Sequence, residues 1–221
     1  MLDNRLEMIF ELLKGRVICD VGTDHCKLAA AAVLRGTADK AYATDLREGP
    51  LSAAKKLIEK EGLSDRIETF LSDGFLDIPD YAFENTDCFV IAGMGGELIA
   101  NIIKGRHTDK YMVLQPMTAI IELVEFLSEN GYEIIKRTLC RDGDKIYNAL
   151  LVKFDGVKRT PDLYCVTDKN QLFYEYMHRE QKRVVTAMEG IRSSEKSDKS
   201  RLAPLQSLLE VIEKELENEG K

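Results

Sequence analysis

Long apolar runs and tryptophan are both missing from this sequence. No stretch approaches the roughly 20 consecutive apolar residues that a membrane span needs. The first residues, MLDNRLEMIFELL, mix acidic and polar side chains with apolar ones. They lack the basic start and the continuous apolar segment of a signal peptide. We therefore expect a cytoplasmic protein that has no membrane partner.

Paired cysteines are missing as well. The cysteines are odd in number and never stand in CxxC spacing; they are Cys19, Cys26, Cys88, Cys140 and Cys165. This pattern argues against a disulfide framework and against a zinc site. We expect small buried side chains in a reducing compartment and no bound metal.

The chain also lacks an excess of positive charge, because its 221 residues carry a net charge of −7. Such a protein has little broad affinity for nucleic acid, although a local basic face is compatible with this balance. The length fits one ordinary domain and a small additional part.

Short apolar runs alternate with helical patterns over the first two thirds of the chain, which is typical of βαβ units around a mostly parallel sheet. The predicted strands are residues 16–21, 40–45, 67–72, 87–92, 111–115, 132–139 and 146–154. The predicted helices between them are residues 25–34, 50–61, 96–103 and 119–130. Only residues 140–145 separate the last two strands, which predicts an antiparallel hairpin because a parallel pair needs a longer crossover. The predicted fold is a Rossmann-like α/β domain.

A second part follows a linker at residues 155–162, which contains Gly156 and Pro161. Helical patterns cover residues 169–191 and 201–219 and are joined by a polar stretch. A short polar turn makes two helices antiparallel neighbours, so we predict a coiled-coil-like helical hairpin. The predicted domains are residues 1–155 and residues 162–221.

Carboxylates follow the first two predicted strands. Asp20 ends the first strand and precedes Gly22 and Asp24, and Asp45 ends the second strand. Open α/β sheets bind ligands at this edge, and a carboxylate after the second strand suits ribose hydroxyls. Acidic residues in the first turn repel a pyrophosphate and suit a cationic cofactor. Asp20 also suits a simple strand-end cap, and nicotinamide enzymes use a residue like Asp45 in the same way.

The third and fifth strands end in further candidates. Asp73 and Gly74 follow the third strand, where a carboxylate can accept the amino group of adenine and where Asp-Gly is also a common turn. Gln115 and Pro116 end the fifth strand. The amide can bind a nucleobase edge or can be an ordinary strand-end polar group.

Glycines surround Met94 after the fourth strand, at Gly93, Gly95 and Gly96. Glycine is costly in conformational entropy, so we expect three of them where the backbone approaches a ligand closely. A tight strand-to-helix turn alone needs only one. Met94 either packs against the ligand or fills the core.

The segments DVGTDH, DLREGPL, SDGF, GMGG and LQP, in this order, resemble the TrmK family of bacterial tRNA (adenine-22-N1)-methyltransferases. The resemblance covers residues 5–154 and implies a class I methyltransferase sheet, with a helical tail of the family's coiled-coil form. It implies S-adenosylmethionine as cofactor, tRNA as partner, and methyl transfer to N1 of an adenine in the D-arm. The cofactor site it implies comprises Gly22, Asp24, His25, Asp45, Asp73, Gly74, Gly93, Met94 and Gly95. We add Asp20 and Leu46, at the ends of the first two strands, to the candidate cofactor residues.

Three positions depart from the family pattern. Ala29 stands where proline is usual, Met117 replaces the last residue of a QPN triplet, and Asn148 replaces the glutamate of a KxYE element. We expect these departures to affect substrate contacts more than cofactor binding.

The chemistry that the resemblance implies is mainly a positioning task, because N1 of adenine carries an unprotonated lone pair near neutral pH. Asp24 is the first candidate to stabilise charge on the base, and His25 is the candidate orienter or proton shuttle. Plain cofactor binding is the alternative role for both residues.

A basic segment is the candidate RNA contact. Residues 169–201 contain eight lysines and arginines, against five acids, in an otherwise acidic chain. Lys182 and Arg183 are the candidate phosphate contacts within it, and a solvated charged helix face is the alternative. Arg5, Gln115 and Pro116 are the other candidate substrate contacts, with Arg5 directed toward either cofactor or RNA.

Two other functions remain compatible with the sequence. One is an S-adenosylmethionine-dependent methyltransferase that acts on another RNA or on a small molecule, for which Met117 and Asn148 are the best support. The other is a non-catalytic Rossmann binding module whose helical hairpin recruits a protein. The intact glycines at residues 93–96 and Asp45 argue against the second.

Overall fold

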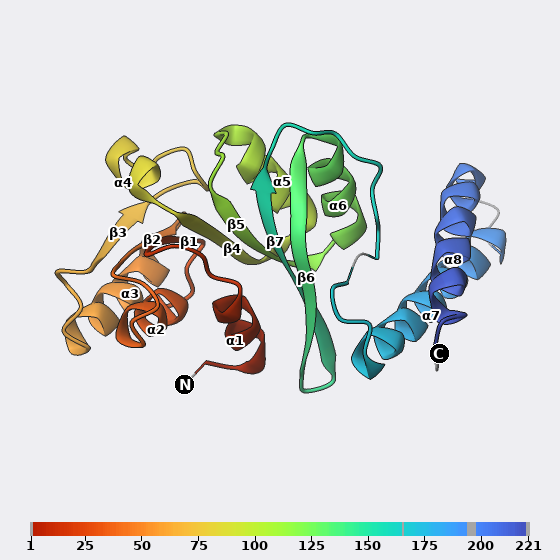
Figure 1. The fold of residues 1–221 in the computed structure, drawn as a ribbon, viewed down its shortest axis with the longest axis horizontal. Coiled ribbons are helices and arrows are strands. Elements are labelled where there is room, and N and C mark those ends of the chain that lie inside the picture. Colours follow the sequence, from red (N-terminus) through yellow and green to blue (C-terminus); the bar gives the residue numbers. More distant parts are fainter. Residues whose placement is uncertain (1, 165, 194–197, 220–221) are drawn as a thin grey trace. The chain divides into compact units, whose positions relative to one another are not determined.

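The computed structural model describes residues 2–164, 166–193 and 198–219. The chain divides into two compact units, Met1–Thr167 and Asp168–Lys221. The first unit is a sheet with helices packed along it, and the second is a pair of helices (Figure 1).

One seven-stranded sheet forms the centre of the first unit, in the order β3-β2-β1-β4-β5-β7-β6. The strands are β1 (Val17–Val21), β2 (Lys40–Asp45), β3 (Ile67–Leu71), β4 (Cys88–Gly95), β5 (Tyr111–Thr118), β6 (Tyr132–Asp142) and β7 (Lys145–Phe154). The first five are parallel, and β7 pairs antiparallel with both β5 and β6. This confirms the predicted Rossmann-like sheet and its closing hairpin. The strand order reverses between β1 and β4, the point at which such sheets bind ligands.

The helices of the first unit are α1 (Asn4–Glu11), α2 (Lys27–Leu34), α3 (Glu48–Lys60), α4 (Asp80–Asn85), α5 (Gly96–Gly105) and α6 (Ile120–Glu129). The sequence patterns predict four of these and miss α1 and α4. Both are short, and the start of α1 depends on a cap, since Asp3 Oδ1 accepts a hydrogen bond from the Leu6 backbone N–H at 2.7 Å.

Two apolar clusters lie on opposite faces of the sheet because successive strand residues point to opposite sides. Ile18 belongs to the cluster formed with α1, α2 and α3, whereas the adjacent Cys19 belongs to the cluster formed with α4, α5 and α6. With both faces covered, the central strands are buried, which explains their continuous apolar runs. The carboxyl ends of β1, β2 and β4 meet at one edge of the sheet.

The cysteines are small buried side chains, as predicted, at Cys19, Cys26 and Cys88, and Cys140 is half-buried. Cys165 lies outside the described residues. Within residues 2–164, 166–193 and 198–219, no group of His, Cys, Asp and Glu is arranged to hold a metal ion. No helix in the same part of the chain is long and apolar enough to cross a membrane.

The second unit is an antiparallel helical hairpin, as predicted. It contains α7 (Gln171–Ser193), a short 3-10 helix (Lys199–Arg201) and α8 (Leu202–Leu216). Lys169 Nζ donates to Glu215 Oε2 at 2.6 Å, so the residues before α7 lie beside the end of α8. The buried residues of α7 recur at helical spacing, among them Val184, Met188 and Ile191, and Ile212 is buried on α8.

The division between the units falls later than the predicted boundary at residues 155–162. Residues 162–167 are part of the first unit because a buried arginine of β6 binds them. The Arg137 guanidinium donates to the Leu163 carbonyl, and the Thr167 backbone N–H donates to the Arg137 carbonyl at 2.9 Å. A buried guanidinium requires such acceptors, and this long-range need cannot be read from the linker's own composition.

Candidate active site

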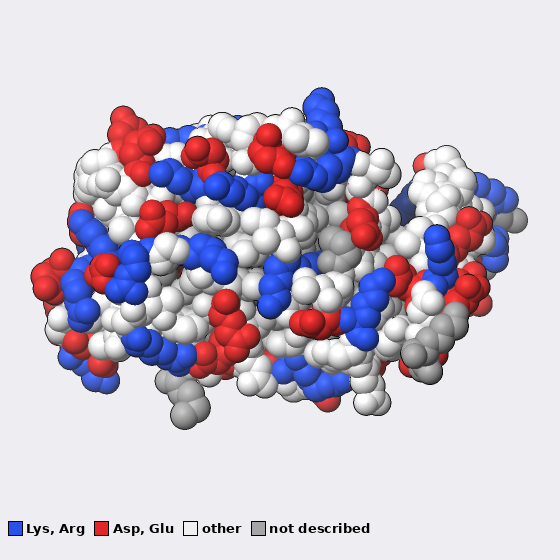
Figure 2. Space-filling view, viewed as in Figure 1, with Lys and Arg blue, Asp and Glu red and all other residues white. Residues whose placement is uncertain are grey.

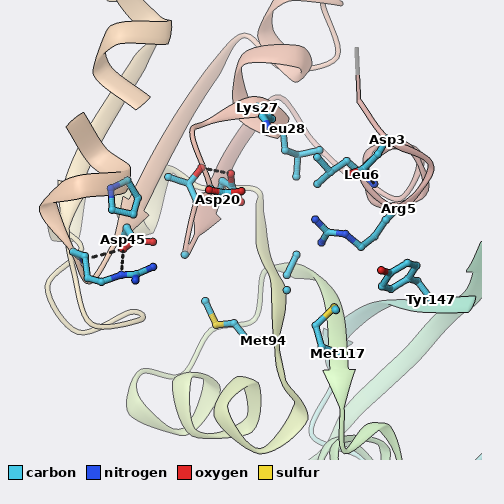
Figure 3. Close-up of a pocket in the computed structure, with 17 residues that line it drawn as sticks. Asp3, Arg5, Leu6, Asp20, Lys27, Leu28, Asp45, Met94, Met117 and Tyr147 are labelled. Atoms are coloured by element: carbon cyan, nitrogen blue, oxygen red, sulfur yellow. Dashed lines mark hydrogen bonds and ion pairs between the residues drawn. The ribbon is translucent and has the colours of Figure 1, made fainter. Parts of the chain in front are cut away.

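A cavity of about 560 Å³ opens at the carboxyl ends of β1, β2 and β4 (Figure 3). In the close-up, Asp20 and Asp45 lie toward one side of the cavity, and Arg5, Met117 and Tyr147 lie toward the other. The cavity is lined by Asp3, Arg5, Leu6, Asp20, Gly22, Thr23, Asp24, Lys27, Leu28, Asp45, Arg47, Pro50, Ala92, Gly93, Met94, Met117 and Tyr147.

Asp20 is a buried carboxylate at the end of β1, with only 7% of its surface exposed. Thr23 Oγ1 donates to Asp20 Oδ2 at 2.6 Å and fixes its orientation. Burial raises the pKa of Asp20 from 3.8 to about 6, although the Thr23 hydrogen bond and the charge of Arg5 act in the opposite direction. Ionisation of Asp20 is therefore unfavourable in the free protein, and a cation in the cavity would stabilise the charged form.

Two glycines that line the cavity have a left-handed backbone conformation, which residues with a side chain rarely adopt. Gly22 has a φ of +76°, and Gly93 has a φ of +79°. A Cβ on Gly22 would lie 2.0 Å from the Met94 methyl, and one on Gly93 would lie 3.8 Å from Arg5 Nη1. The Met94 methyl therefore occupies the space of a Gly22 side chain, whereas the space of a Gly93 side chain stays open.

The other glycines of the GMGG segment have a different role from the one we expected. A Cβ on Gly96 would lie 2.1 Å from the Ala119 carbonyl oxygen, so this glycine allows α5 to start directly against the residue before α6. Gly95 has an ordinary φ of −68° and faces Thr118. Gly96 therefore allows a close approach between two segments of the protein backbone, and not the approach to a ligand that we expected.

Asp45 is buried at the end of β2, with 8% of its surface exposed. Asp45 Oδ1 accepts a hydrogen bond from the Arg47 backbone N–H at 2.8 Å, and Arg47 Nε lies 3.7 Å from the same oxygen. The turn after β2 thus holds the carboxylate at the cavity wall, while the Arg47 side chain is 78% exposed.

Asp24 and His25 occupy the turn between β1 and α2. Asp24 lines the cavity with an exposed side chain, and its Oδ1 lies 3.1 Å from His25 Nε2. His25 and Cys26 both have a left-handed backbone, with φ values of 59° and 58°. Consecutive non-glycine residues in this region are strained, and such strain is typical of functional turns. His25 itself is not among the lining residues.

Four predicted cofactor residues besides His25 also lie outside the cavity lining: Leu46, Asp73, Gly74 and Gly95. Leu46 is 64% exposed, next to the lining residue Asp45. A Cβ on Gly74 would lie 2.8 Å from Ile102, so this glycine allows α5 to pack against the turn after β3. The cavity therefore brings together Asp20, Gly22, Asp24, Asp45, Gly93 and Met94 of the predicted cofactor set.

The opposite wall joins residues that are distant in sequence. Arg5 Nη1 of α1 donates to Gln115 Oε1 of β5 at 2.9 Å, and the Arg5 guanidinium carbon lies 6.0 Å from the centre of the Tyr147 ring. Gln115 is fully buried, and its Nε2 donates to the Pro116 carbonyl at 2.9 Å. Gln115 and Pro116 therefore lie behind the cavity wall, whereas Arg5 lines the cavity.

Sequence reasoning missed Tyr147, Lys27 and Arg47 as lining residues. Tyr147 belongs to the KxYE-like element, whose last position is Asn148. Asn148 is buried away from the cavity, and its Oδ1 accepts two hydrogen bonds from Arg137, at 3.0 and 2.8 Å. Of the three departures from the family pattern, only Met117 lines the cavity.

The predicted RNA contacts Lys182 and Arg183 lie on α7, and both are exposed. Arg183 Nη2 donates to Glu180 Oε2 at 2.7 Å, and Arg179 forms a similar pair with Glu175. Lys196 of the same basic segment lies outside the described residues. Basic and acidic side chains are interspersed over the face of the molecule seen in Figure 2.

Comparisons with known proteins find similar tRNA methyltransferases. The tRNA (adenine(22)-N(1))-methyltransferase of Bacillus subtilis (strain 168) is 28% identical over 98% of this chain and 98% of its own. The crystal structure of the B. subtilis M1A22 tRNA methyltransferase TrmK has a TM-score of 0.83, with 27% identity over 98% of this chain and 99% of that one. A Streptococcus pneumoniae protein solved in complex with S-adenosyl-L-methionine has a TM-score of 0.81, with 25% identity over 98% of this chain and 100% of that one. These similarities confirm the predicted resemblance to TrmK. The profile of a methyltransferase domain matches residues 2–150, and the chain therefore belongs to this methyltransferase family.

Proposed function

We propose that this protein transfers a methyl group from S-adenosylmethionine to N1 of an adenine in the D-arm of tRNA. The observation that carries the proposal is the cavity at the switch point of the sheet, where buried carboxylates face a guanidinium and an aromatic ring. Similarity over nearly the whole chain to a tRNA (adenine(22)-N(1))-methyltransferase supports the same substrate. Modification of tRNA is consistent with a cytoplasmic location.

The residues of the cavity fit this cofactor. Asp20 is a buried anion with a raised pKa, which suits the cofactor's ammonium group. Asp45, held by the backbone of Arg47, is placed to accept hydrogen bonds from ribose hydroxyls. Arg5 supplies a cation for the carboxylate of the amino-acid group. Gly93 leaves space where a side chain would intrude, and Gly22 makes room for the Met94 side chain.

S-adenosylmethionine, when bound, supplies the methyl group: the N1 lone pair forms the new bond to carbon, and the electrons of the broken carbon–sulfur bond remain on sulfur. Positive charge thereby passes to the base, so a nearby carboxylate favours the product side. Asp24 is our candidate for this role, since it lines the cavity and its side chain is free to approach a base. His25 orients Asp24 through their 3.1 Å contact.

The target base has to leave the RNA fold before N1 is accessible. The exposed basic residues of the second unit, including Lys182 and Arg183, are proposed to bind RNA phosphates. Because neighbouring glutamates neutralise part of this positive charge, we expect the affinity for tRNA to depend only moderately on salt concentration.

A second candidate is transfer to another RNA, and Met117 favours it. This residue lines the cavity where the family pattern has an amide, so a contact that helps to define the substrate has changed.

Transfer to unmodified bacterial tRNAs tests the proposal. The purified protein is incubated with labelled S-adenosylmethionine, and the product is mapped by nuclease digestion and mass spectrometry. We expect 1-methyladenosine at a D-arm adenine, lost in Asp24→Ala and retained in Glu11→Ala, which changes an exposed carboxylate on α1 outside the cavity. Cofactor binding with transfer only to other RNAs would support the second candidate instead.

A further inference from the structure

The cavity wall opposite Asp20 and Asp45 differs in chemistry from the carboxylate side. Tyr147 of β7 and Met117 of β5 contribute an aromatic ring and a thioether to it (Figure 3). Tyr147 is half-buried, and Met117 is 45% exposed. Ring faces and soft sulfur atoms suit a flat, neutral ligand better than an ion.

These side chains are linked by a continuous set of contacts. Gln115 Nε2 lies 3.6 Å from Met117 Sδ, and Gln115 Oε1 accepts the 2.9 Å hydrogen bond from Arg5. The Arg5 guanidinium in turn lies 6.0 Å from the centre of the Tyr147 ring. Gln115 joins Arg5 to Met117 and is fully buried, so its side chain is held in one position. The wall is therefore organised before any ligand arrives.

Tyr147 is held from behind as well. It packs against the apolar cluster on the α1 side of the sheet and also lines the cavity. A ring supported on one side and facing a cavity on another is a ready stacking platform, because little side-chain entropy is lost when a ligand covers it.

We propose that Tyr147 and Met117 form the slot that receives the flipped target adenine. This inference rests on the proposed function and adds the subsite for the acceptor base. The carboxylate side of the cavity holds the cofactor in that proposal, so a base against Tyr147 faces the methyl donor across the cavity. Arg5 lies on the same wall as Tyr147 and Met117 and lines the cavity beside them.

Substitution of the ring tests the slot. Tyr147→Leu keeps apolar packing against the cluster and removes the aromatic face, whereas Tyr147→Phe keeps the face. Stacking on one aromatic side chain predicts a fall of about 10- to 100-fold in kcat/KM for tRNA in Tyr147→Leu. We expect Tyr147→Phe to stay within about threefold of the wild type, and the cofactor Kd of both variants to stay within about twofold. The control is Tyr81→Leu, which removes an exposed tyrosine of α4 outside the cavity.

A fluorescent base distinguishes stacking from a general structural effect. A D-arm RNA with 2-aminopurine at the mapped position is bound to each variant in the presence of S-adenosylhomocysteine. We expect stronger fluorescence in the Tyr147→Leu complex than in the wild-type complex, because the flipped base loses its quenching partner.

The outcomes separate this inference from the proposed function. If the wild type methylates tRNA and Tyr147→Leu does so with equal kcat/KM and equal fluorescence, the slot is overturned. A matching loss of cofactor affinity in Tyr147→Leu overturns it too, because Tyr147 would then belong to the cofactor subsite. If the wild type methylates no tRNA, the proposed function itself fails.

Discussion

Asp20 is expected to make the free protein less stable than it would be with a neutral side chain at this position. Its pKa is raised from 3.8 to about 6, and each pH unit of such a change corresponds to about 1.4 kcal/mol. The folded protein therefore loses about 3 kcal/mol of stability at neutral pH. The sign follows from the raised value: the penalty is absent below the unfolded pKa of 3.8 and complete above pH 6.

Asp20→Asn removes this penalty while retaining an oxygen that can accept the Thr23 hydrogen bond. In a chain of this length we expect the thermal unfolding midpoint at pH 7.5 to rise by about 6–12 °C. The gain should shrink as the pH falls and should vanish near pH 4. Asp24→Asn is the control, because its largely exposed carboxylate faces water and should leave the midpoint unchanged at either pH.

The same variant should bind S-adenosylmethionine poorly, since the carboxylate is proposed to pair with the cofactor's ammonium. In the wild type the cofactor Kd should rise about tenfold from pH 7 to pH 5, as the charged fraction of Asp20 falls. Unfolding scans and calorimetric titrations measure these effects. A destabilised Asp20→Asn, or a gain that is the same at pH 4 and pH 7.5, would refute the reasoning.

Three further substitutions have defined outcomes. Gly93→Ala should weaken cofactor binding about tenfold and cost about 1–2 kcal/mol in unfolding free energy, because φ is +79° there and the new Cβ would enter the cavity beside Arg5; equal affinity would contradict this. Gly190→Ala, near the C-terminal end of α7 where nothing lies close to the new Cβ, should instead stabilise by about 0.5–1 kcal/mol, as denaturant titration will show. Arg137→Met should lower the unfolding free energy by about 2–6 kcal/mol, because two buried acceptors, Asn148 Oδ1 and the Leu163 carbonyl, lose their donor at a cost of about 1–3 kcal/mol each, and an unchanged denaturation midpoint would exclude that role.

The strands could be predicted because both faces of the sheet are covered, so each central strand is a short apolar run. Predicted and observed boundaries differ most at β6, which continues through Asp142, and at β4 and β5, which continue through Gly95 and Thr118. Pairing between β4 and β5 extends past their apolar residues, into the polar residues of the site. The sequence patterns miss α1 and α4 because both helices are short, and a short helix depends on tertiary packing more than on its own sequence pattern.

The side of the cavity that contains the carboxylates could be predicted from the sequence. Asp20, Asp45 and Gly93 each lie near the carboxyl end of a parallel strand, and parallel strands place their carboxyl ends at one edge. The other side did not follow, because Arg5 and Tyr147 meet only through the folding of α1 against the β6–β7 hairpin. Asn148 shows the same limit: its partner is the buried Arg137, and the sequence alone could not indicate that pairing.

The central claim is that the acceptor atom is N1 of an adenine in tRNA. The most direct measurement replaces the mapped adenine with 1-deazaadenine, which has a carbon in place of N1, and compares methyl transfer and binding for the two RNAs. The proposed mechanism predicts no transfer to the substituted RNA and little change in its affinity. Transfer at the wild-type rate would show that another atom accepts the methyl group and would contradict the account.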